Sequence, residues 1–216
     1  MTRAFSIIGQ AFRLWWREFM LLIFFNLLWL ALQIPIVTGP PATAAMYAIA
    51  RRLADGEFIE PRHGLEALRR MFTPAWVWGA INLLIVGVLV GNFWLYQSAT
   101  GWLWTGLRLG WGAIALGWFT VNLFYWPFWL AQDQRSPMLT FRNSFLFLAK
   151  QPGMALTLML ISALLIVVSV LTTLPLAAAL MAWLALASVL AVDEALKPIT
   201  EQAASQAPPQ QSDSLT

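Results

Sequence analysis

The stretch QIPIVTGPPATAAM, residues 33 to 46, decides how this chain is threaded. It interrupts an apolar run with three prolines and one glycine, and the apolar composition resumes directly after it. Proline lacks a backbone N–H and fixes φ, so it ends a helix but suits the first turn of a new one. The stretch therefore predicts one helix that ends near residue 37 and a second that begins at Pro41.

The composition around this break is typical of a membrane protein. Of the 216 residues, 60% are hydrophobic and only 11% charged, whereas a soluble domain has roughly 25% charged residues. The mean hydropathy is +0.69. A net charge of +3 could indicate nucleic acid, but the basic residues are scattered between apolar runs. We therefore predict the lipid bilayer as the environment and no nucleic-acid partner.

Five apolar runs without charged residues predict an all-α, polytopic transmembrane helix bundle. Each has the about 17 to 25 residues that span a bilayer as a helix, which pairs every backbone group internally. None alternates with a period of two residues, as a barrel strand would. The runs cover residues 20–37, 75–96, 109–132, 154–174 and 176–192.

Three further segments predict amphipathic helices that lie in the membrane interface. Residues 2–19 carry Arg, Ser and Gln on one face and aromatic and aliphatic residues on another. Similar segments follow Pro61 and the pair Ser136-Pro137. We expect a single membrane-embedded domain over residues 1–197. The polar residues 198–216 predict a disordered cytoplasmic tail, because they contain too little apolar surface to fold.

The distribution of basic residues indicates that the chain returns across the membrane after the break. If it returns, twelve of the 13 Lys and Arg residues lie on one side and only Arg108 on the other. Cytoplasmic loops collect such residues, so this threading predicts an inner-membrane protein with both termini in the cytoplasm. Residues 41–54 would be only about 21 Å long as a helix. The return is therefore either a re-entrant hairpin or a short sixth crossing.

Residues 26–57, NLLWLALQIPIVTGPPATAAMYAIARRLADGE, resemble the YesL-like family of small bacterial integral membrane proteins, a domain of unknown function. The later segment SPMLTFRNSFLFLAKQPG, residues 136–153, is also similar to that family. The resemblance implies a bacterial inner-membrane protein, often encoded beside carbohydrate ABC uptake systems. It implies no mechanism.

The sequence contains no pattern typical of catalysis. No Asp, Glu, Lys, Arg or His falls inside the five runs, and His63 stands alone in a predicted basic loop without metal-ligand spacing around it. We therefore predict no enzyme, no cofactor and no metal site. Amides at membrane depth usually bond between helices, and alternatively they could line a small polar cavity at the break. The candidate residues of that cavity are Asn26, Gln33, Pro35, Thr38, Pro41 and Thr43.

Two functions of different classes remain open at this point. The first is an accessory or regulatory component of bacterial carbohydrate uptake, with an ABC transporter permease subunit as its partner. The second is a small-solute permease in its own right. A continuous polar path between the helices would favour the permease, whereas a sealed core would favour the accessory role.

Overall fold

The computed structural model describes residues 2–172 and 179–206, which are helical apart from short connections and contain no strand. The all-α class predicted from the sequence is confirmed for this part of the chain. In chain order, the helices are α1 (Thr2–Arg17), α2 (Phe19–Gln33), α3 (Gly39–Ala54), α4 (Pro61–Arg70), α5 (Phe72–Leu95), α6 (Trp102–Ala131), α7 (Pro137–Lys150), α8 (Pro152–Thr172) and α10 (Leu180–Gln206).

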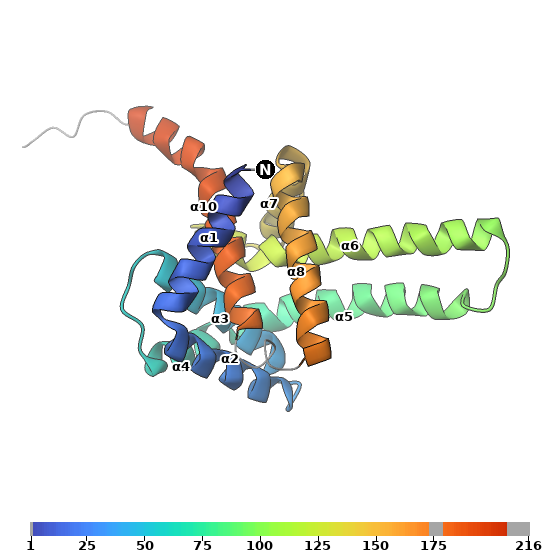
Figure 1. Cartoon of the computed structure of the whole chain (residues 1–216), viewed down its shortest axis with the longest axis horizontal. Helices are drawn as coiled ribbons and strands as arrows, with labels where there is room; N and C mark the ends of the chain where they lie inside the picture. The colour runs from blue at the N-terminus through green and yellow to red at the C-terminus, as the bar shows by residue number, and fades with distance from the viewer. Residues whose placement is uncertain (1, 173–178, 207–216) are drawn as a thin grey trace, which may run out of the picture.

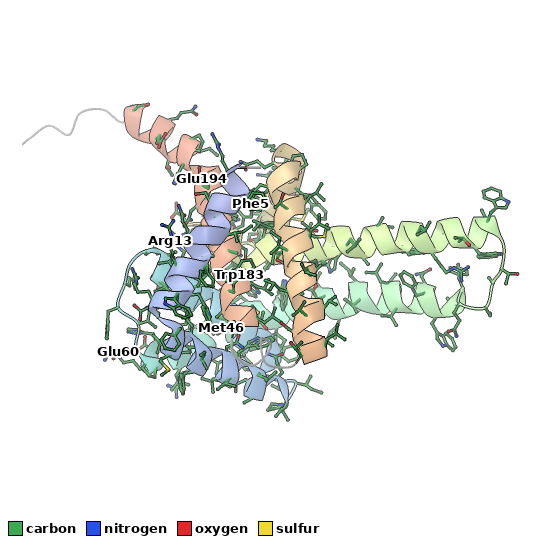
Figure 2. All side chains as sticks on the ribbon, in the orientation of Figure 1. Phe5, Arg13, Met46, Glu60, Trp183 and Glu194 are labelled. Atoms are coloured by element: carbon green, nitrogen blue, oxygen red, sulfur yellow. The ribbon has the colours of Figure 1, made fainter. Side chains whose placement is uncertain are left out.

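Helices α3 and α10 form the centre of the fold. They pack against each other, and α1, α2 and α6 pack around them. Figure 2 shows Met46 of α3 and Trp183 of α10 within this centre, and both side chains are buried. Residues 180–189 are buried all round. The apolar composition of this part of α10 therefore serves contacts with other helices.

Helices α5 and α6 form a long antiparallel hairpin that projects from the centre (Figure 1). Its far end is held by Arg108, whose guanidinium donates to the carbonyl oxygens of Gln97 (3.5 Å) and Ala99 (3.2 Å). Gly101 begins the return with a φ of 110°, which glycine adopts without steric cost. Helix α8 runs across the direction of the hairpin in the same view.

The expected count of five long helices is not confirmed. Within the described residues, α5, α6 and α8 are long and apolar enough to cross a membrane. A fourth crossing would need α1 and α2, which meet at a bend of 94°. The first predicted run is shorter than expected because α2 has 15 residues and ends at Gln33. The last, 176–192, begins outside the described residues, and its described part lies in the buried α10.

Helix α1 is amphipathic, as predicted from the pattern of residues 2–19. Its small side chains Ala4 and Ala11, together with Ile7, are buried against the bundle. The larger Phe5 and Phe12 are mostly exposed. The small residues allow the close approach of α1 to α10, so the aromatic face remains available to the membrane interface. Its location in that interface stays a prediction.

The boundary of the predicted tail differs from the structure. Helix α10 continues through Pro198 to Gln206, nine residues into the segment expected to be disordered. The Thr200 hydroxyl donates to the carbonyl oxygen of Lys197 (2.9 Å), and the Lys197 ammonium lies 2.6 Å from a Glu194 carboxylate oxygen. These local contacts sustain an exposed helix without a core to pack on. Residues 207–216 lie outside the described part.

Candidate functional site

The break between α2 and α3 is a tight turn whose polar groups are satisfied locally. The Thr38 hydroxyl donates to the carbonyl oxygen of Leu32 (2.6 Å), near the end of α2. The Gln33 amide donates to the carbonyl oxygens of Trp29 (3.2 Å) and Gly39 (3.5 Å). Ile36 has a φ of 58°, which a β-branched residue rarely adopts. The turn is therefore held by side chains on both of its flanks.

The prolines of the motif have two different environments. Pro41 is buried in the first turn of α3, where its missing N–H costs nothing. Pro35 is exposed within the turn itself. The predicted start of the second helix is thus confirmed to within two residues, since α3 begins at Gly39.

Thr43 and Asn26 connect the break to other helices. The Thr43 hydroxyl accepts a hydrogen bond from the Trp29 indole (3.0 Å), which ties α3 to α2. The side-chain oxygen of Asn26 accepts from the backbone N–H groups of Met181 (2.9 Å) and Ala182 (3.2 Å). Asn26 is fully buried. It therefore acts as an N-cap for α10 from a helix more than 150 residues away in sequence, because those two groups have no partner within α10.

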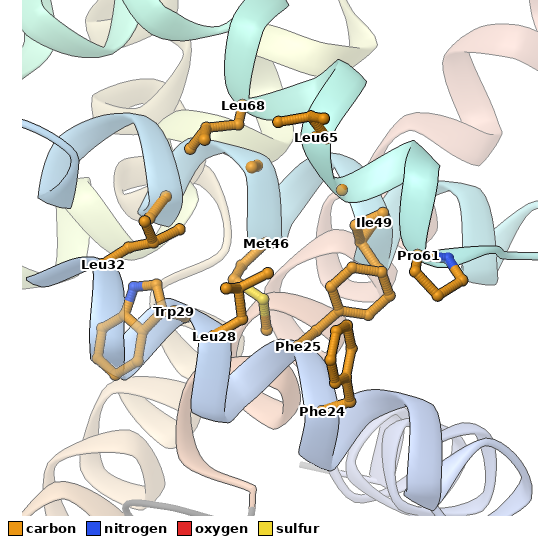
Figure 3. A pocket seen from close by; sticks show the side chains of 13 residues that line it. Phe24, Phe25, Leu28, Trp29, Leu32, Met46, Ile49, Pro61, Leu65 and Leu68 are labelled. Carbon is orange, nitrogen blue, oxygen red and sulfur yellow. The ribbon is translucent and has the colours of Figure 1, made fainter.

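The cavity beside the break is apolar and does not include the six candidate residues. It lies between α2, α3 and α4 and has a volume of about 210 Å³. Figure 3 shows its lining, which includes Phe24 and Phe25 of α2, Met46 and Ile49 of α3 and Leu65 of α4. Gln33 instead lines a separate open hollow beside α5. The structure thus uses Asn26, Thr38 and Thr43 for contacts between and at the ends of helices, and their role in a ligand cavity stays a prediction.

A reciprocal pair of hydrogen bonds joins the two helices of the hairpin. The Trp78 indole of α5 donates to Asn122 of α6 (2.8 Å), and the Trp118 indole of α6 donates to Asn82 of α5 (2.9 Å). Each asparagine also donates to the carbonyl oxygen of the tryptophan four residues earlier in its own helix, at 2.9 Å. These four residues, which we call the Trp–Asn pairs, fix the register of α5 against α6.

Amides at membrane depth were expected to bond between helices, and Asn82 and Asn122 do so, but the sequence analysis did not identify their tryptophan partners. The signal that could have identified the pairs is the repeated spacing of a tryptophan and an asparagine four residues apart, in WGAIN (78–82) and WFTVN (118–122). Residues at this spacing lie on one face of a helix. Asn92, in contrast, donates to the carbonyl oxygen of Val88 in its own helix (2.8 Å).

A charged contact joins the two central helices, α3 and α10. Arg51 of α3 donates to both carboxylate oxygens of Asp55 (3.0 and 2.6 Å) and to Asp193 of α10. Burial acts to lower the pKa of the Arg51 guanidinium, but the two carboxylates outweigh it and raise this pKa above its ordinary value. Arg51 therefore stays protonated and joins the two central helices. Within residues 2–172 and 179–206, no group of three or more His, Cys, Asp or Glu could hold a metal ion.

Comparison with known protein families gives a match over the segment that contains the break and most of α5. Residues 22–93 match a family model described as "Protein of unknown function, DUF624". The matched segment begins within α2 and ends within α5, so it includes Asn26, the turn and Thr43. No curated protein matches the chain, and no solved structure matches it. The match supports a domain of unknown function and identifies no chemistry.

Proposed function

We propose that this protein is a multi-pass protein of the bacterial inner membrane that acts through helix contacts, as an accessory or regulatory component of carbohydrate ABC uptake. The link to carbohydrate uptake comes from the resemblance of residues 26–57 and 136–153 to the YesL-like family. The mode of action is argued from the packing of the described helices. We assign both termini to the cytoplasm on the distribution of Lys and Arg.

The observation that carries this proposal is that three amides among the apolar helices, those of Asn26, Asn82 and Asn122, are bonded to other helices of the protein. Asn26 holds the start of α10, and Asn82 and Asn122 hold the hairpin together. The cavity beside the break is lined by apolar groups. A solute that crosses a membrane needs polar groups that can exchange bonds with it. Amides already bonded between helices support a structural role.

The hairpin supplies a surface for contacts with other membrane helices. Leu83, Leu84 and Val90 of α5 are each more than 60% exposed. Figure 2 shows side chains projecting outward along both α5 and α6. No ionisable residue lies in residues 72–95, so this surface suits lipid chains and partner helices equally. A permease subunit could therefore pack along α5 without disturbing the centre of the fold.

Site-specific photocrosslinking in native membranes tests the proposal. A photoreactive amino acid at Leu84 or Val90 should crosslink an ABC transporter permease subunit, identified by mass spectrometry. The matched control is Leu160 of α8, whose 62% exposure is close to that of Val90 at 61%. We expect much weaker crosslinking from this control position. Absence of a permease subunit from both hairpin positions would contradict the proposal.

A second measurement separates this proposal from the permease. The purified protein alone is reconstituted into liposomes, and uptake of small sugars and sugar alcohols is measured against empty liposomes. We expect equal uptake in both. Saturable uptake that needs only this protein would contradict an accessory role and would support a small-solute permease.

A further inference from the structure

A small basic pocket lies between α3, α4 and the connection that follows α6. Its volume is about 110 Å³. Its polar lining consists of Arg52 from α3, His63, Glu66 and Arg70 from α4, and Arg135 from the connection. The remaining lining is apolar and includes Met71, the residue directly before α5. The pocket therefore lies where a candidate membrane span begins.

The pocket carries positive charge that the protein does not neutralise. The lining has three guanidinium groups and one carboxylate, and a second carboxylate, that of Glu57, pairs with Arg52 from outside the lining, which leaves one net positive charge around the pocket. Arg52 has an ion pair with Glu57 at 3.6 Å. The guanidinium groups of Arg70 and Arg135 have no ion pair or hydrogen bond with any residue in the described part of the chain. Unpaired cations around one cavity attract an anion from outside the protein.

His63 adds a hydrogen-bond donor to the lining. Sequence reasoning placed it in a solvated loop, but it is the third residue of α4 and is half-buried. Its Nδ1 accepts the backbone N–H of Glu60 at 3.1 Å, in a capping box that begins the helix. Because Nδ1 accepts, the proton of the neutral ring is on Nε2. Besides the guanidinium groups, the Nε2–H group of His63 is therefore a second kind of donor that is available to an anion.

The geometry points to a phosphate group as the ligand of this pocket. Arginine presents a planar fork of N–H donors that matches the oxygens of phosphate in a bidentate contact. Pockets that enclose whole drug-sized ligands have about 300–1,000 Å³, so this smaller pocket fits a single anionic group and excludes a sugar ring. The phosphate belongs either to a lipid headgroup beside α5 or to a soluble phosphate compound.

The site is independent of the proposed role in carbohydrate uptake. A phospholipid whose chains lie along the hairpin would bring its headgroup to the start of α5, at the level of Arg70 and Arg135. Basic residues at this level of the membrane also favour a cytoplasmic location of this end of the hairpin, through their charge alone. This effect on orientation differs from binding of a phosphate, because orientation needs only positive charge whereas a binding site needs particular arginines.

Binding measurements on the full-length protein test the site in two arms. The protein is purified in maltoside detergent, which contains no phosphate group. One arm titrates inorganic phosphate and the other titrates phosphatidylglycerol, each followed by calorimetry. Arg70→Gln and Arg135→Gln should each weaken binding by at least about tenfold, as expected for a lost charge-assisted hydrogen bond. Arg142→Gln is the matched control, because Arg142 is an exposed residue of α7 outside the pocket and the charge change is the same.

The two arms also identify the source of the phosphate. Binding of phosphatidylglycerol alone, lost in the two pocket variants, supports a lipid headgroup, and binding of inorganic phosphate with the same losses supports a soluble compound. Failure of both ligands to bind, or an equal loss in Arg142→Gln, overturns the proposal. If a glutamine variant does not fold, Arg→Lys at that position replaces it. Lysine keeps the charge but not the fork, so unchanged binding by that variant also overturns the site.

Discussion

The burial of Asn26 predicts a specific loss of stability when its amide is removed. Leucine has a similar size and shape, so Asn26→Leu removes the acceptor of the Met181 and Ala182 N–H groups without opening a large cavity. Loss of an N-cap costs about 0.5–2 kcal/mol, and each buried donor left without a partner costs about 1–3 kcal/mol. Both backbone groups belong to buried residues. We expect the free energy of unfolding to fall by about 2–4 kcal/mol.

Titration with sodium dodecyl sulfate in mixed micelles, followed by tryptophan fluorescence, measures this free energy. Asn92→Leu is the matched control, because Asn92 bonds only within α5 on the exposed hairpin. A substitution at such a position, away from contacts with other helices, usually changes the free energy of unfolding by less than about 0.5 kcal/mol. If Asn26→Leu were as stable as Asn92→Leu, Asn26 would not anchor α10, and the reasoning from the two hydrogen bonds would be refuted.

Three further predictions follow from other contacts. A double-mutant cycle of Trp78→Phe and Asn122→Ala in the same titration should give a coupling free energy of about 0.6–1.7 kcal/mol, as for other hydrogen bonds between membrane helices; a coupling of zero would contradict the Trp–Asn pairs. Thr43→Val should cost about 1–2 kcal/mol in thermal or detergent unfolding because the Trp29 indole loses its acceptor, and an equal effect of the exposed Thr105→Val would remove that explanation. The protein contains no Cys, so single cysteines can be probed with an impermeant thiol reagent in spheroplasts that express it. The reagent should label Ser98→Cys at the hairpin end but reach Phe58→Cys only after permeabilisation. Labelling of position 58 alone would reverse the assigned orientation.

Local sequence patterns were sufficient for the elements around the break. Proline chemistry located the start of the second helix, because α3 begins two residues before the predicted Pro41, but α2 ends at Gln33, four residues before the expected end. Amides within apolar surroundings indicated bonds between helices, and Asn26, Asn82 and Asn122 make such bonds. These inferences succeeded because each depends on a residue and its near neighbours in the chain.

The partners of these groups depended on contacts that are distant in sequence. Thr43 was named only as a candidate residue of a polar cavity, and the structure shows that its hydroxyl accepts a hydrogen bond from the Trp29 side chain. The six candidate residues do not converge on the cavity beside the break, which apolar side chains line. His63 and Arg135 meet at one pocket although they are far apart in the chain. Nothing in their local sequence indicates that proximity.

The sequence by itself determined the helical class, the apolar character of the chain and the position of the turn. The tertiary structure alone decided which apolar helices face outward and which form the centre. Residues 180–189 and residues 72–95 are similarly apolar, yet the first segment is buried and the second projects in the hairpin. Hydropathy cannot separate them, because removal of an apolar side chain from water is equally favourable beside lipid or beside another helix. Only the packing of α1, α2, α3 and α6 around α10 makes that distinction.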